Sequence, residues 1–172
     1  FDGNFRSKLW ESWRDEAPAI LKQMFEHADV LFGDERDIAL VLNRDFGDGP
    51  AEGRRARAAA AAFEAFPRLK RIAATGRLQH AVDDQDLGAA MFTRAGAHAV
   101  APVRLSSIVD RLGTGDAFAA GVIHGLLSGE SDAEALRFGH AAACLKHSIP
   151  GDFLTLGVEA VRAAMSEGGL DV

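Results

Sequence analysis

One short stretch restricts the fold of this chain more than any other. The residues GTGD at 113–116 stand directly before a long run of small and apolar residues, 117–127. Two glycines around a single residue let the backbone turn tightly, and the apolar run predicts a helix over 114–128 that is buried on most of its faces. A helix that begins in this way directs several backbone N–H groups at one point, at the positive end of its dipole. The stretch therefore predicts an anion-binding turn at the start of a buried helix.

Asp116 lies in the first turn of this helix, where its carboxylate can reach the same point. Phosphoryl transfer requires such an arrangement: amides hold the transferring group, and a carboxylate takes the proton of the attacking hydroxyl. The local pattern fits equally well a tight turn in which Asp116 only caps a helix. The Walker-type phosphate loop is absent from the sequence, and Phe118 replaces the third glycine of a dinucleotide-binding motif.

Short apolar runs alternate with longer helical patterns along the chain. Buried strands are expected at 29–33 and 71–75, a strand at the opening FDGNF, antiparallel additions within 77–105, and a last strand in AHAVAPV that Pro102 stops. Helices are expected at 18–28, 35–42 with Asp34 as its cap, 54–66, 114–128, 131–147 and 158–165. This order predicts an α/β fold with a mainly parallel sheet.

The composition narrows the class of partner. A formal charge of −6 over 172 residues argues against a broad surface for nucleic acid or an anionic membrane, and no apolar run reaches the roughly 18 residues of a spanning helix. A single cysteine, Cys144, indicates a reducing compartment, and we expect the cytoplasm. Any phosphate chemistry is therefore expected to be local.

The stretch DRLGTGDAFAAG at 110–121 resembles the C-terminal motif of the ribokinase-like sugar kinases, also called the pfkB family. Within the family the chain is most similar to the 2-keto-3-deoxygluconate kinases, because FDGNFRSKLW, FGDERDIALVL and LKHSIPGDF follow in the expected order. The resemblance implies a three-layer α/β/α fold with a mainly parallel central sheet. It also implies that residues 1–172 are the C-terminal, nucleotide-binding and catalytic portion of one kinase domain, without its N-terminal part and lid.

The resemblance also implies roles for individual residues. Asp116 would be the catalytic base, with the amides of Gly113, Thr114, Gly115 and Asp116 as the anion hole for the γ-phosphate of ATP. Sugar-acid contacts would come from Asn4, Arg6, Asp116 and Asp152, and nucleotide contacts from Asp34, Thr75, Gly76, Arg77, Gly113 and Gly115. Asp34 and Asp37 stand where the family usually carries Asn-x-x-Glu, so Asp37 would approach Mg²⁺ through water. Without the family, Arg6 reads as a surface ion pair, Asp152 as a turn residue and Asp34 as a helix cap.

Two further clusters have plain interpretations. His140, Cys144 and His147 share one helical face and could present three metal ligands, but one helix supplies no fourth ligand, and we expect core and rim residues. The arginine cluster at 54–57 is expected to be a solvated helix face rather than a nucleic-acid site.

The expected activity is therefore phosphorylation of a hydroxyl of 2-keto-3-deoxygluconate with ATP and Mg²⁺. The alternatives are another sugar or nucleoside kinase of the family, and a piece that binds nucleotide without turnover. The expected partners are the sugar acid and ATP, with homo-oligomerisation through the lid region and no nucleic acid or membrane.

Overall fold

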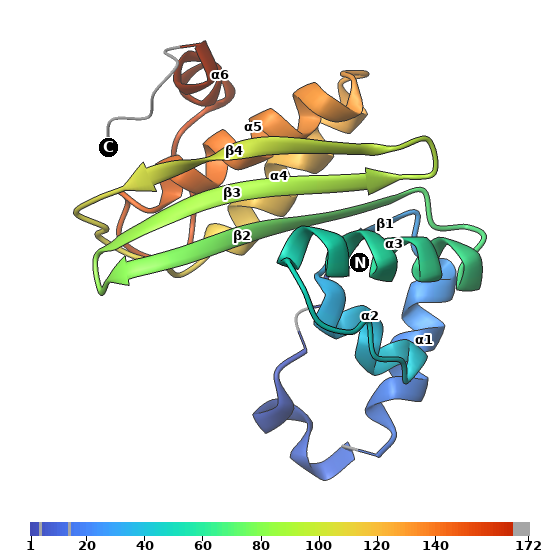
Figure 1. Cartoon of the computed structure of the whole chain (residues 1–172). Coiled ribbons are helices and arrows are strands. Elements are labelled where there is room, and N and C mark those ends of the chain that lie inside the picture. The colour runs from blue at the N-terminus through green and yellow to red at the C-terminus, as the bar shows by residue number, and fades with distance from the viewer. Residues whose placement is uncertain (4, 14, 167–172) are drawn as a thin grey trace. The chain divides into compact units, whose positions relative to one another are not determined.

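The computed structural model describes residues 1–3, 5–13 and 15–166 (Figure 1). The chain forms two compact units. The first unit holds Phe1–Ala74 and Phe92–Ala97, and the second holds Thr75–Met91 and the residues from His98 onward. Strand β2 (Arg71–Ala81) begins in the first unit and ends in the second. None of the helices in the described ranges is long and apolar enough to span a membrane.

Parallel strand pairing organises the first unit. Strand β1 (Val30–Phe32) pairs in parallel with the start of β2, from Val30 opposite Arg71 to Phe32 opposite Ala73. On the other side of β1, Asp2 forms a parallel bridge to Phe32, and the amide of Gly3 donates to the Phe32 carbonyl at 2.7 Å. The predicted strands at 29–33 and 71–75 are confirmed, and the opening residues pair as a strand does.

Three α-helices cover this parallel pairing: α1 (Ala17–His27), α2 (Glu35–Leu42) and α3 (Ala51–Ala65), preceded by the short 3₁₀ helix η1 (Ser7–Trp13). Their apolar faces meet in a core in which the rings of Phe25 and Phe66 pack edge to face, with centroids 5.5 Å apart. Helix α3 begins at Ala51, three residues before the predicted start, and Pro50 is its N-cap residue, with the extended backbone that is usual at this position.

The second unit contains an antiparallel meander. Strands β2, β3 (Asp84–Thr93) and β4 (Ala97–Leu105) are neighbours in this order, and their arrows alternate in direction in Figure 1. The predicted antiparallel additions are thus present, and the sheet is mixed. The expectation that Pro102 stops the last strand is wrong, because β4 continues through it. β4 is the last strand in the order of this sheet, and a proline, which has no N–H to donate, is tolerated in such an edge strand.

Helices α4 (Thr114–Leu127) and α5 (Asp132–Lys146) lie together behind this meander (Figure 1), and α6 (Val158–Ser166) packs on α5. A Cβ added at Gly121 would stand 2.7 Å from the Gly139 Cα, so only glycine permits this closeness of α4 to α5. The prediction that α4 is buried on most faces needs correction. Ile123 is 43% and Leu127 84% exposed, because the helix buries one broad face, the one that α5 contacts.

Candidate functional site

The turn before α4 is shaped by one glycine. Gly113 is the N-cap residue and has φ +70°, in the left-handed region that favours glycine. A Cβ added there would stand 1.8 Å from the carbonyl oxygen of Asp152. Gly113 is therefore required twice, for its own backbone conformation and for the close passage of the chain at Asp152.

The first amides of α4 are left open by this turn. The first intrahelical hydrogen bond runs from the Ala117 amide to the Gly113 carbonyl at 2.8 Å, and no side chain in the described ranges caps the amides before it. The side chain of Asp116 is exposed in the same turn, and no hydrogen bond or ion pair to another described residue engages it. Among the described residues, the first amides of α4 and the Asp116 carboxylate thus lie at one helix end without side-chain partners, and the anion-binding role of this turn stays a prediction.

The turn is held from behind by the segment that follows α5. The carbonyl of His147 accepts from the amides of Val109 and Asp110, at 2.9 and 3.2 Å. The Asp110 carboxylate accepts from the Leu112 amide at 2.9 Å and from the Gly151 amide at 2.8 Å, and these two hydrogen bonds hold its pKa below its usual range. The motif Asp-x-x-Gly-x-Gly-Asp begins with Asp110, and only the folded chain shows that this residue joins the turn to the segment after α5.

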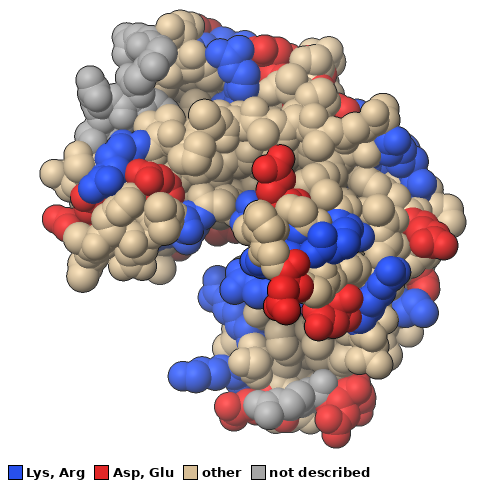
Figure 2. Space-filling view, in the orientation of Figure 1, with Lys and Arg blue, Asp and Glu red and all other residues tan. Residues whose placement is uncertain are grey.

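Basic side chains gather at this turn. Arg77 of β2 donates to the Thr114 hydroxyl at 3.1 Å, and that hydroxyl donates to the Arg111 carbonyl at 3.1 Å. The pKa of His147 is lowered first by burial and further by the charges of Arg77, Arg111 and Lys146, so these three cations lie near His147, whose carbonyl holds Val109 and Asp110. Elsewhere on the visible surface of each unit, charges of both signs are interspersed (Figure 2). A local group of cations is compatible with the expected local site for a phosphate in a chain of net charge −6.

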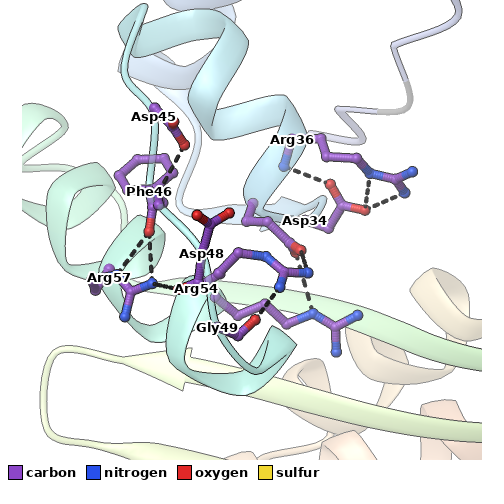
Figure 3. A network of polar contacts seen from close by, with 11 residues as sticks. Asp34, Arg36, Asp45, Phe46, Asp48, Gly49, Arg54 and Arg57 are labelled. Atoms are coloured by element: carbon purple, nitrogen blue, oxygen red, sulfur yellow. Dashed lines mark hydrogen bonds and ion pairs between the residues drawn. The ribbon is translucent and has the colours of Figure 1, made fainter.

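Asp34 and Asp37 form a capping box at the start of α2 in the first unit. Asp34 accepts from the Arg36 amide at 2.8 Å and from the Arg36 side chain, as Figure 3 shows; burial works to raise its pKa, but these contacts hold it below the usual range. Asp37 accepts from the amides of Asp34 and Phe5, at 3.0 and 3.4 Å, and burial raises its pKa. The capping interpretation of Asp34 is thus correct, and it leaves the nucleotide role open.

The surroundings of Asp37 are compatible with an indirect contact to a metal ion. Its two oxygens already accept backbone hydrogen bonds, and no group of three or more His, Cys, Asp or Glu side chains in the described part of the chain is placed to hold a metal ion. A magnesium ion takes most of its ligands from phosphates and water when it binds with a nucleotide. The residues present therefore fit the predicted contact through water.

The remaining predicted residues divide between the units. Thr75, Gly76, Arg77 and Asp152 lie in the second unit with the α4 turn, where Arg77 and Asp152 adjoin it directly. Arg6 is exposed and lies in the first unit with Asp34 and Asp37, and Asn4 lies outside the described residues. The sugar-acid roles of Asn4 and Arg6 stay predictions.

The side chains of His140, Cys144 and His147 are buried, as expected for core residues. His140 Nε2 lies 2.8 Å from the Leu87 carbonyl, and His147 is bonded through Nδ1 to the Ala143 carbonyl at 2.7 Å and through Nε2 to Gln85 at 2.8 Å. Burial raises the pKa of the Cys144 thiol to about 12. These contacts tie α5 to β3, and the imidazole nitrogens are used within the core.

The two buried histidines make folding pH-dependent. Burial lowers the pKa of His140 and of His147, so the unfolded chain takes up protons near pH 6.5, the ordinary value, that the folded chain refuses. The contribution of the two neutral histidines to the free energy of unfolding is therefore fully present above this pH and is lost as the pH falls through it. Urea unfolding between about pH 7.5 and 5.5 should show this loss, and the free energy of unfolding should depend less steeply on pH in His147→Gln. The exposed His27→Gln is the control and should keep the wild-type slope; equal slopes in all three proteins would contradict the assignment.

The arginine cluster of α3 is more than a solvated face. Arg54 and Arg55 both pair with Glu35 of α2 at 3.3 Å, and Arg57 donates to the carbonyls of Phe46 and Asp48 (Figure 3). The cluster therefore ties α3 to α2 and to the loop that precedes it, which the local pattern of charges did not indicate.

Comparison with known proteins agrees with the motif. The sequence pattern of the family described as pfkB family carbohydrate kinase matches residues 1–152. The chain is 32% identical over 173 residues to a 2-dehydro-3-deoxygalactonokinase of Haloferax volcanii. The alignment covers 99% of this chain and 48% of that protein. The chain therefore spans about half the length of this relative.

The chain is also similar to solved structures of carbohydrate kinases, over about half of the length of each. A 2-dehydro-3-deoxygluconokinase of Thermotoga maritima is 32% identical with a TM-score of 0.85, over 96% of this chain and 49% of that one. A pfkB family carbohydrate kinase of Listeria grayi is 27% identical with a TM-score of 0.85, over 97% and 49%. The predicted α/β, ribokinase-like fold class is confirmed. With its motif, its fold and its match over residues 1–152 in agreement, this chain belongs to the pfkB family of carbohydrate kinases.

Proposed function

We propose that the protein carrying this chain transfers the γ-phosphate of ATP to a hydroxyl of 2-keto-3-deoxygluconate. The observation that carries the proposal is the α4 turn, where amides without a side-chain cap lie beside Arg77 and the Asp116 carboxylate has no partner among the described residues. The names of the relatives in Haloferax volcanii and Thermotoga maritima support a 2-keto-3-deoxy sugar acid as the substrate class.

Asp116 acts as the general base in this proposal. Its carboxylate accepts the proton of the attacking hydroxyl while the hydroxyl oxygen forms a bond to the γ-phosphorus and the bond to the β-phosphate oxygen breaks, leaving ADP with the electron pair. The amides of Gly113, Thr114, Gly115 and Asp116 donate to the oxygens of the transferring group, on which negative charge is concentrated. Because they are fixed by the turn, little reorganisation is needed during the reaction.

Arg77 supports the same phosphate. One of its N–H groups donates to the Thr114 hydroxyl, which orients the guanidinium beside the turn, and its other donors have no partner among the described residues. Thr75 and Gly76 of β2 would contribute contacts to the nucleotide, and a nucleotide contact is also proposed for Asp34. Mg²⁺ bound with ATP would neutralise phosphate charge, and Asp37 would contribute to holding it through water.

The sugar acid is held by the remaining residues. The guanidinium of Arg6 would donate two hydrogen bonds to the carboxylate of the sugar acid, and Asn4 and Asp152 would form hydrogen bonds with the sugar's hydroxyls. The reaction would take place in the cytoplasm, in keeping with the free, buried thiol of Cys144.

Two alternatives to this function remain, because the residues that would bind the phosphate do not select the sugar. The Haloferax volcanii relative is named for the galactonate epimer, so 2-keto-3-deoxygalactonate is the first competing substrate. The second alternative is that residues 1–172 by themselves bind nucleotide without turnover.

A coupled ADP assay on the complete protein tests the proposal, with both epimers, ribose, fructose and adenosine as acceptors. We expect the highest kcat/KM with 2-keto-3-deoxygluconate. Turnover confined to a neutral sugar or a nucleoside would refute the substrate, and absence of turnover with every acceptor would refute the activity. Calorimetry on residues 1–172 tests the second alternative, that these residues alone bind nucleotide without turnover. This alternative requires binding of ATP-Mg²⁺ without binding of the sugar acid.

A further inference from the structure

Lys146 is a fully buried lysine with few partners. It is the last residue of α5, its side chain is 0% exposed, and its Nζ donates one hydrogen bond, to the Ile149 carbonyl at 2.8 Å. Within residues 1–3, 5–13 and 15–166 it forms no ion pair. An ammonium group with a single acceptor has lost the water that served its other two protons, which costs free energy. Such a cost needs a compensating role close by.

The location of Lys146 indicates what that role is. Its hydrogen bond holds the Ile149 carbonyl, two residues before the Gly151 amide that binds Asp110. The other oxygen of Asp110 binds the Leu112 amide, directly before Gly113. The Lys146 charge also helps to keep the pKa of Asp110 low, after its backbone hydrogen bonds. A continuous set of contacts thus runs from the Lys146 ammonium to the turn that opens α4.

We propose that Lys146 is a positioning residue for phosphoryl transfer, whose buried ammonium orders the turn at 149–151 and, through Asp110, fixes the amides of residues 113–116. This inference rests on the proposed function. The same positive charge favours an anion at the start of α4, because a charge surrounded by protein is screened less than one in water. Lys146 touches neither the nucleotide nor the sugar in this role, so its effect is on the geometry and potential of the amides.

The test compares Lys146→Met with Lys22→Met in the complete protein. Methionine keeps much of the length of the lysine and removes its charge, and Lys22 is an exposed lysine of α1, remote in sequence from the turn. We expect Lys146→Met to lower kcat/KM for ATP by about 10- to 100-fold, in the range of lost oxyanion contacts, with the KM for the sugar acid within about twofold of wild type. Lys22→Met should keep the wild-type constants.

A rescue experiment separates positioning from packing. In Lys146→Ala, ammonium chloride should restore part of the lost kcat/KM for ATP, whereas tetramethylammonium chloride at the same ionic strength should not, because only the small ion can donate to the Ile149 carbonyl. This arm also serves if the methionine variant does not fold. Equal responses to the two salts would overturn the proposal.

The failure of this inference is distinguishable from failure of the proposed function. If the wild-type protein phosphorylates no acceptor, the proposed function fails. The role of Lys146 is then tested by comparing the ATP-Mg²⁺ affinity of Lys146→Met with that of the wild-type protein by calorimetry. A loss of about tenfold or more in Lys146→Met then supports the inference. Unchanged affinity, or wild-type kcat and KM in an active enzyme, overturns it.

Discussion

Replacing Asp116 by asparagine is expected to lower kcat of the complete protein by about 10²- to 10⁴-fold, the usual contribution of a general base. Asparagine keeps the size of the side chain and cannot accept the hydroxyl proton at neutral pH. Because the Asp116 side chain is exposed and has no partner among the described residues, its loss should leave the fold intact. The affinity for ATP-Mg²⁺ should change little or increase slightly, since a negative charge near the phosphates is removed.

The measurement is a steady-state ADP assay combined with calorimetry of nucleotide binding. Asp15→Asn, an exposed aspartate in the turn before α1, is the matched control and should retain wild-type kcat. Wild-type turnover in Asp116→Asn would disprove the base assignment. A loss of nucleotide affinity with unchanged kcat would instead assign Asp116 to binding.

The second large effect is expected at Gly113. An alanine there would adopt a left-handed backbone that costs of order 1 to 3 kcal/mol, and its Cβ would collide with the Asp152 carbonyl, so the turn must move. We expect a loss of at least about 2 kcal/mol in the free energy of unfolding and a fall in kcat/KM for ATP of about 10²- to 10³-fold, because the amide donors are displaced.

Gly115→Ala is the matched variant for stability. A Cβ at Gly115 would meet no atom within 4 Å, and the residue lies in the first turn of α4, where alanine is a better helix former. Its free energy of unfolding, measured in urea, should equal or slightly exceed the wild-type value. Equal stability of Gly113→Ala and Gly115→Ala would show that the chain near Asp152 can move aside at no cost, and that the turn is not fixed as described.

The sequence predicted most helices and the turn before α4 because these depend on neighbours close along the chain. Asp34 caps α2 as expected, and Ser131 caps α5 by accepting from the Glu134 amide at 3.2 Å. The left-handed conformation at Gly113 likewise follows from the requirements of one residue. The resemblance to the pfkB family rests on the same short motif, so contiguous residues are sufficient to indicate the family.

Other expectations failed where distant segments decide. The exposure of Leu127 depends on which face of α4 meets α5, and the passage of β4 through Pro102 depends on its place in the sheet order. The pairing of Arg54 and Arg55 with Glu35 joins residues about twenty positions apart. No local pattern contains this information, because hydrophobic periodicity reports that a face is apolar and not what covers it.

Lys146 illustrates the same division within the site. Its spacing of seven residues from Gly139 and three from Ala143 places it on the buried face of α5, yet a lysine at a helix end is ordinarily solvated. The sequence alone predicted an anion-binding turn and a candidate base and indicated the family, since these predictions rest on contiguous residues. Tertiary structure alone decided that Lys146 is buried and that Asp110 binds the segment after α5, because burial and hydrogen bonding between distant residues arise only once the chain has folded.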